Sequence, residues 1–101
     1  MSKQFVSVTT NADSSNELFY PRINVIATGK NLQRIRLSYE FTQSYVASQL
    51  GKDGISPAAI SQWENGKCMP DMDNLVILCC LYGNCTFDDL IVLDYPKKEA
   101  S

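Results

Sequence analysis

The chain has 101 residues, of which 45% are hydrophobic and 20% are charged, proportions typical of one soluble globular domain. No apolar stretch approaches membrane-spanning length, and the start, MSKQFVSVTT, lacks the apolar core of a signal peptide. We therefore expect a cytoplasmic protein without membrane contact. The sequence has no histidine, no glycine-rich phosphate loop and no carboxylate pair beside a nucleophile, which argues against an enzyme.

The cysteine content raises the question of disulfides or a zinc site. Zinc sites are usually built from paired ligands on tight turns, but this chain has no histidine and no Cys-x-x-Cys pair, and two of its cysteines are adjacent. We therefore expect reduced, mostly buried thiols, with no metal and no other cofactor. The cysteines are Cys68, Cys79, Cys80 and Cys85.

The distribution of charge is more informative than its total. The net charge of −2 by itself argues against a nucleic-acid partner. However, residues 22–67 hold six basic and three acidic residues, whereas residues 68–101 hold two basic and six acidic ones. Such asymmetry allows one face to approach phosphates while another is repelled. Alone this is a weak signal, because surface lysines are usually only solvated.

The ends of the chain differ in character from its middle. Residues 1–20 are rich in Ser, Thr and Asn and are predicted to be a flexible N-terminal arm. The alternation FVSV at 5–8 is typical of a strand, but one such run cannot make a sheet alone. We expect a domain over residues 21–95 and a C-terminal tail over 96–101. The first helix of this domain is predicted with Thr28 as its N-cap.

The clearest helix signals come in the middle of the chain. The hydroxyl of Thr42 can cap a second helix, which Gly51 ends. Ser56 can cap a third helix, and Pro57 suits its first position, where the missing N–H costs nothing. Gly66 supplies a left-handed stop. These signals predict two short helices with a brief connection between them.

Two more helices follow. The residues Pro70 and Asp71 open a fourth helix, which ends near Gly83. Thr86 begins a capping pattern, with a carboxylate three residues after a hydroxyl, and predicts a short fifth helix over Phe87 to Val92. Five short helices with short loops predict an all-α, compact five-helix domain.

The order and spacing of the central residues resemble the phage-repressor and Cro-like helix-turn-helix proteins, the XRE family. The resemblance spans residues 28–92, and it implies a lambda-repressor-like fold in which the third helix lies in the DNA major groove. The lead-in to the first helix is also similar to a small Firmicute-type branch. The residues that carry the resemblance are Thr42-Gln43, Val46-Ala47, Leu50-Gly51, Ser56, Ile60-Ser61, Trp63-Glu64-Asn65-Gly66-Lys67, Pro70, Leu75 and Leu90.

The resemblance also implies roles for individual residues. Gln43, at the start of the second helix, matches a position that contacts phosphate, and Asn65 and Lys67 match backbone-contacting positions after the third helix. Asn65 is also a natural turn residue. Arg36 and Glu64 match positions that form a partly buried, structural ion pair in related repressors.

One departure lies in the turn between the second and third helices. The residues Lys52, Asp53 and Gly54 are extra relative to the family pattern. Loop closure tolerates such an insertion easily, although it can alter the angle between the two helices. Lys52 either adds a phosphate contact or belongs to an inert, longer loop.

The third helix offers few side chains for reading bases. Gln62 can bond to both adenine N6 and N7, and alanine methyls can meet a thymine methyl. Because so few side chains can contact bases, we expect specificity to depend also on dimer spacing, DNA shape or the N-terminal arm. The residues expected to face the groove are Pro57, Ala58, Ala59, Ser61 and Gln62.

The leading interpretation is a sequence-specific protein that binds double-stranded DNA as a homodimer and acts as a transcriptional regulator, expected to be a repressor. Apolar residues in the fifth helix and in the stretch 91–95 are the natural dimer surface. No small-molecule ligand is evident. The alternative is a helix-turn-helix used as a protein-interaction module, such as an antitoxin-like partner, which the acidic total charge favours.

Overall fold

The computed structural model describes residues 20–51 and 55–96. Its five helices belong to one compact unit, Ile23–Leu93, and residues 20–22 and 94–96 are grouped apart from it. Most of the expected arm, the loop residue Lys52 and nearly all of the expected tail lie outside the described residues. The elements are β1 (Arg22–Ile23), α1 (Val25–Ser38), α2 (Gln43–Leu50), α3 (Pro57–Glu64), α4 (Met72–Leu81), α5 (Phe87–Leu90) and β2 (Leu93–Asp94).

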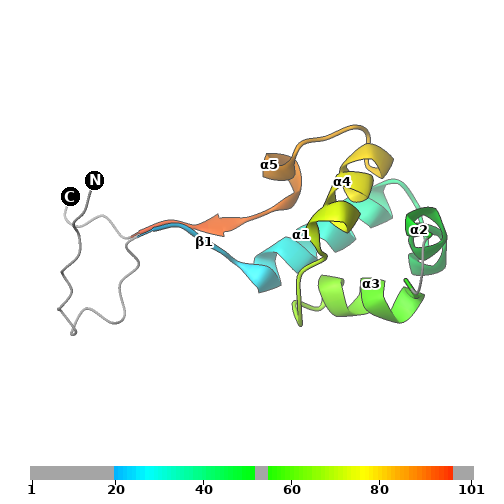
Figure 1. Cartoon of the computed structure of the whole chain (residues 1–101), viewed down its shortest axis with the longest axis horizontal. Helices are drawn as coiled ribbons and strands as arrows, with labels where there is room; N and C mark the ends of the chain where they lie inside the picture. Colours follow the sequence, from blue (N-terminus) through cyan, green and yellow to red (C-terminus); the bar gives the residue numbers. More distant parts are fainter. Residues whose placement is uncertain (1–19, 52–54, 97–101) are drawn as a thin grey trace. The chain divides into compact units, whose positions relative to one another are not determined.

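The helices confirm the predicted five-helix, all-α class, with one small addition. Strands β1 and β2 pair in a two-stranded sheet, which the sequence analysis did not predict. In Figure 1, α3 runs along one edge of the helical unit, whereas α4 and α5 lie on the opposite side. Among the described helices, none is both long and apolar enough to cross a membrane.

The central helices begin and end where their capping residues predicted. The hydroxyl oxygen of Thr42 accepts the N–H of Tyr45 at 2.9 Å, and that of Ser56 accepts the N–H of Ala59 at 3.3 Å. Gly51 ends α2 in a left-handed conformation with φ of 47°. These contacts involve neighbours in sequence, so the residues alone were sufficient to indicate them.

The start of α1 differs from the prediction. Asn24, not Thr28, caps this helix, because the Asn24 side-chain oxygen accepts the N–H of Ala27 at 2.9 Å. Thr28 lies one turn inside the helix and is fully buried. Its hydroxyl oxygen accepts the N–H of Val92 at 2.9 Å, a contact across 64 residues. Thr28 therefore does not cap α1 but joins it to the segment that follows α5.

The fifth helix is shorter than predicted. It ends at Leu90, and Ile91 is extended with φ of −94° and ψ of 129°. The backbone of Val92 is held by α1, since its carbonyl accepts the N–H of Asn24 at 2.8 Å. Strand β2 then follows. Part of the surface expected to form the dimer, residues 91–95, is thus already paired with β1 inside the chain.

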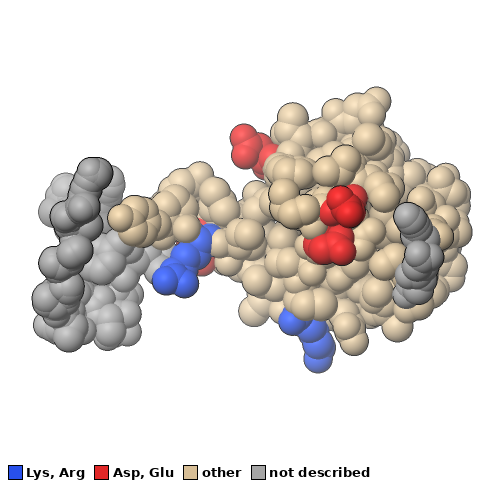
Figure 2. All heavy atoms as spheres, viewed as in Figure 1, with Lys and Arg blue, Asp and Glu red and all other residues tan. Residues whose placement is uncertain are grey.

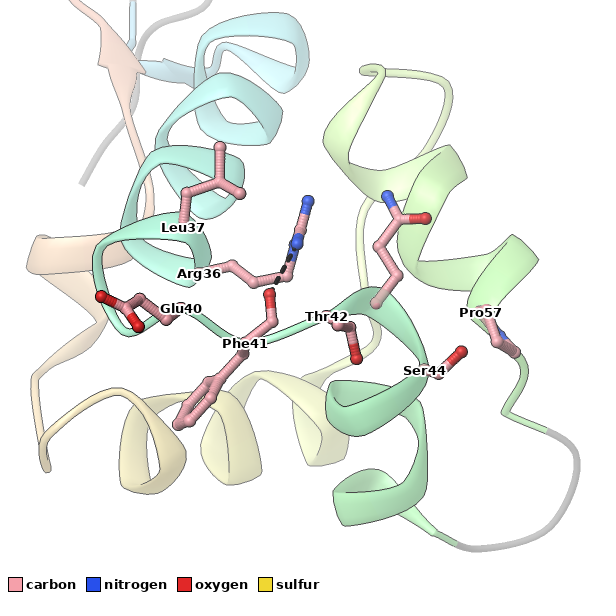
Figure 3. A pocket seen from close by; sticks show the side chains of 8 residues that line it. Arg36, Leu37, Glu40, Phe41, Thr42, Ser44 and Pro57 are labelled. Atoms are coloured by element: carbon pink, nitrogen blue, oxygen red, sulfur yellow. Dashed lines mark hydrogen bonds between the residues drawn. The ribbon is translucent and has the colours of Figure 1, made fainter.

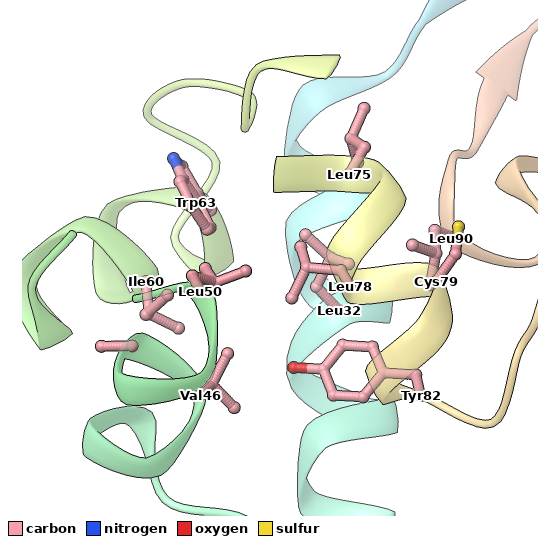
Figure 4. Close-up of a cluster of buried hydrophobic side chains, with 11 residues drawn as sticks. Leu32, Val46, Leu50, Ile60, Trp63, Leu75, Leu78, Cys79, Tyr82 and Leu90 are labelled. Carbon is pink, nitrogen blue, oxygen red and sulfur yellow. The ribbon is translucent and has the colours of Figure 1, made fainter. Parts of the chain in front are cut away.

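A single hydrophobic core joins the helices (Figure 4). Leu50, Val46, Ile60 and Trp63 meet the side chains of α1, α4 and α5 across its centre. The buried members of this core are Leu32, Val46, Ala47, Leu50, Ile60, Trp63, Leu75, Leu78, Cys79, Tyr82 and Leu90.

The four cysteines are free thiols, and burial, together with Cys85, raises the pKa of Cys79 to about 11.

Gly29 allows α1 to approach the end of α3 closely. A Cβ atom at this position would collide with the carbonyl oxygen of Trp63 and lie 2.7 Å from that of Glu64. Both atoms are backbone and cannot rotate away. The absence of a side chain at Gly29 therefore sets the distance between α1 and the last turn of α3.

We expect Gly29→Ala to destabilise the fold by about 1–3 kcal/mol, because overpacking forces backbone apart. Alanine ordinarily stabilises a helix interior by up to about 1 kcal/mol relative to glycine. A loss of stability in Gly29→Ala would therefore indicate the clash with the α3 backbone. Urea unfolding measures the loss. The control is Lys30→Ala, an exposed neighbour on the same helix, which should change stability by less than about 0.5 kcal/mol. Equal or higher stability of Gly29→Ala would contradict the close approach.

Candidate nucleic-acid interface

A buried ion pair joins α1 to α3. The Arg36 Nε donates to Glu64 Oε2 at 2.6 Å and its Nη2 donates to Glu64 Oε1 at 3.0 Å. The two side chains are only 8% and 3% exposed. This hydrogen bonding raises the pKa of the Arg36 guanidinium further above its ordinary value. The fork geometry fixes both the distance and the rotation of α3 against α1.

The same pair also holds the start of α2. Arg36 Nη1 donates to the carbonyl oxygen of Phe41 at 2.8 Å, just before the α2 cap. Gln43 Nε2 donates to Glu64 Oε1 at 3.0 Å. One arginine, one glutamate and one glutamine thus connect α1, α2 and α3. We call these three side chains the Arg36 network.

A buried tyrosine closes the network from the side of α4. Tyr82 is only 4% exposed, and its ring stacks with Tyr39 at a centroid distance of 6.1 Å. Burial chiefly raises the pKa of the Tyr82 hydroxyl, and the negative charge of Glu64 raises it further. The phenol therefore remains neutral beside the ion pair, which is shielded from water on this side.

The outward face of α3 carries small side chains. Pro57, Ala58 and Gln62 are exposed. Ala59 is half-buried against the core, and Ser61 is half-buried with its hydroxyl oxygen accepting Asn65 Nδ2 at 3.2 Å. Of the five residues expected to face the groove, three are therefore open to a partner and two are partly engaged within the fold.

The turn after α3 exposes the two remaining predicted contacts. Asn65 and Lys67 are both exposed. Gly66 between them adopts φ of 75°, and the Lys67 N–H donates to the carbonyl oxygen of Gln62 at 3.0 Å. This turn is thus ordered by backbone contacts, and it presents the Lys67 ammonium beside the end of α3.

Gln43 makes an internal contact that the sequence did not indicate. Its amide already donates one hydrogen bond to Glu64. A second amide hydrogen remains, together with the backbone N–H at the first position of α2, where helix geometry provides no internal acceptor. Gln43 therefore makes an internal contact and keeps donors that this contact does not use.

An open hollow of about 760 Å³ lies where α1, α2 and α3 meet (Figure 3). Hydroxyls of Thr42 and Ser44 lie at its α2 side, and Pro57 lies at the α3 side. Glu40, whose φ is 61°, also lines the hollow, and its carboxylate points away from Gln43. The sequence marked Thr42 only as a cap and did not single out Ser44 or Glu40. The lining comprises Arg36, Leu37, Glu40, Phe41, Thr42, Gln43, Ser44 and Pro57.

On the face of the helical unit that Figure 2 shows, basic and acidic side chains lie apart. In Figure 2, a basic side chain lies at the lower edge of this unit, on the side where α3 runs in Figure 1, and acidic side chains lie higher, toward α4 and α5. The separation matches the uneven charge along the sequence. On this face, a polyanion would be attracted by the basic side chain near α3 and repelled by the acidic side chains toward α4 and α5.

Two short consecutive helices, α2 and α3, of which the second is fixed to α1 by a buried ion pair and has an exposed face, define a helix-turn-helix domain. A helix-turn-helix family model matches residues 32–90. The chain therefore belongs to the helix-turn-helix family of XRE-type DNA-binding regulators. No curated protein matches the sequence.

We expect Arg36→Met or Glu64→Leu alone to cost about 3–5 kcal/mol, because each leaves a buried charge without its partner. The double variant should lose clearly less than the sum of the two, since no uncompensated charge remains. Denaturant unfolding of all four proteins gives the coupling energy.

The matched control is Arg34→Met, which removes an exposed cation from the same helix and should cost less than about 0.5 kcal/mol. Additive losses from Arg36→Met and Glu64→Leu would mean that the pair does not couple α1 to α3.

Proposed function

We propose that this protein binds double-stranded DNA sequence-specifically and acts as a transcriptional repressor. The observation that carries the proposal is the placement of α3. Its inner side is fixed by the core and by Glu64, while Pro57, Ala58 and Gln62 remain exposed on its outer side. The inner side of such a helix is held rigidly by the domain, and its outer side is accessible to the major groove of DNA.

The exposed side chains favour affinity over discrimination. Gln62 is the only exposed residue of α3 with an amide that can bond to a base edge. One bidentate contact discriminates by about 1–3 kcal/mol. Phosphate contacts from Gln43, Asn65 and Lys67 are therefore proposed to supply most of the binding free energy.

A single glutamine contact gives little sequence specificity, so a second recognition helix is needed. We propose a homodimer that places two α3 helices in successive major grooves of a short palindrome. Within residues 91–95, Tyr95 is 67% exposed, whereas Ile91, Val92 and Leu93 are half-buried, so Tyr95 is the candidate for the dimer contact. A repressor of this kind acts in the cytoplasm by occupying its site.

A protein-interaction module is the second candidate. Met72 and Val76 lie one turn apart on α4 and are 63% and 50% exposed. Apolar side chains at this spacing form a stripe that a partner helix can cover. This candidate predicts no affinity for DNA, so a DNA-binding measurement separates the two.

We expect the protein to bind random duplex DNA at low salt and to weaken steeply as salt increases, because bound phosphates release counterions. The double variant Gln43→Ala/Lys67→Ala should weaken binding to all sequences alike and flatten the salt dependence. Fluorescence anisotropy at several salt concentrations measures both effects.

Arg34→Ala serves as the charge-matched control for Lys67→Ala. The Arg34 guanidinium bonds to Asn31 at 2.6 Å, toward the α5 side of α1, so its removal should change the salt slope little. An absence of binding to any duplex at low salt would favour the interaction module. A loss confined to one DNA sequence would contradict the phosphate roles of Gln43 and Lys67.

Glu40 should oppose DNA binding, because it lines the same hollow as Gln43 and its negative charge repels phosphate. We expect Glu40→Gln to strengthen binding to every sequence severalfold at low salt, with the gain fading as salt screens the repulsion. The side-chain amide keeps the shape, and the left-handed backbone is the same in both proteins. If Glu40→Gln binds DNA no more tightly than the parent protein, no phosphate lies near this hollow and the proposed contact of Gln43 is wrong.

A further inference from the structure

One flank of α1 is exposed along its length. Ile26 and Leu37 are 60% and 55% exposed, and Lys30 and Gln33 between them are also exposed. Successive members are three or four residues apart, so they form one stripe along the helix. We call Ile26, Lys30, Gln33 and Leu37 the α1 flank.

The α1 flank lies directly beside α3. Near its middle, Gly29 brings the α1 backbone against the carbonyls of Trp63 and Glu64. At one end, Ile26 packs against the turn that precedes Lys67, since a Cβ atom on Gly66 would lie 2.8 Å from Ile26 Cα.

At its other end the α1 flank reaches the hollow. Leu37 lines this hollow together with Gln43 and Pro57. The flank therefore runs from the turn after α3 to the starts of α2 and α3. Both of its ends adjoin residues already proposed to contact DNA.

The direction of the flank follows from helix geometry. Viewed down α1, Gly29 points at α3, and the buried residues Thr28 and Leu32 are rotated to one side of it, toward the core. Lys30 and Leu37 are rotated to the other side, at about 100° per residue. The flank therefore lies on the side of α1 that is turned away from the core, next to the contact with α3.

We propose that the α1 flank is a second phosphate-contacting edge of the DNA surface, with the Lys30 ammonium and the Gln33 amide directed to the backbone of the groove that α3 enters. This inference rests on the proposed function. Lys30 makes no ion pair with any residue of the described chain, so its charge is available. Arg34, one turn on, is instead bonded to Asn31, whose amide donates to the carbonyl of Leu90 in α5.

The test compares Lys30→Ala with Arg34→Ala, two variants that remove the same charge from neighbouring turns of one helix. Lys30→Ala should weaken binding to selected and random duplexes by the same factor. It should also flatten the slope of log affinity against log salt by about 1, the value for one lost phosphate contact. Gln33→Ala should weaken binding with little change in slope. Equal urea midpoints for all variants establish that the fold is intact.

Each outcome separates this inference from the proposed function. If the parent protein binds and Lys67→Ala flattens the salt slope, but Lys30→Ala behaves as Arg34→Ala does, the α1 flank is not a DNA contact and the proposed function stands. If Lys30→Ala affects only one DNA sequence, the contact is to a base and the phosphate assignment is wrong. If the parent binds no duplex, the proposed function itself fails.

Discussion

The bidentate bond between Arg36 and Glu64 is the interaction on which the arrangement of the helices depends. It is buried, and it joins α1 to α3 while the third nitrogen of the same guanidinium holds the Phe41 carbonyl at the entrance to α2. A buried ion pair is seldom a large source of stability, because desolvation offsets much of the attraction. Its geometry is strict, however, and here it determines the angle at which the exposed face of α3 is presented.

The same bond links packing to the proposed chemistry. Gln43 donates to Glu64 from the first position of α2, so the side chain proposed to meet a phosphate is oriented by the carboxylate that orients α3. A shift of α3 would therefore move both the base-reading face and a backbone contact together. The close approach of α1 at Gly29 adds a second constraint on the same helix, and it brings the α1 flank alongside.

Local signals predicted most of the fold, whereas contacts distant in sequence explain its differences from expectation. Thr42, Ser56 and Asp71 cap their helices through neighbours three residues away, and the sequence alone indicated them. The role of Thr28 depends on Val92, 64 residues later, and no local pattern records that contact. The Arg36–Glu64 pair was expected from the family resemblance, not from the residues themselves.

The candidate site divides in the same way. Helical spacing suggested that Ala59 and Ser61 face the groove, yet Ala59 packs partly on the core and Ser61 accepts from Asn65. Both effects depend on how α3 is rotated, which tertiary contacts decide. Likewise, Leu37 and Glu40 reach the hollow only because α1 ends beside the start of α2. A prediction that considered only the third helix could therefore not include them.

We propose that DNA docks on the side of the helical unit where α3, the start of α2 and the α1 flank adjoin. Titration of the isotopically labelled protein with a short duplex, followed by amide and side-chain NMR shifts, tests this most directly. We expect little change along α4 and α5 and the largest shifts at four residues, Gln43, Gln62, Lys67 and Lys30. Shifts concentrated on α4, around Met72 and Val76, would contradict it.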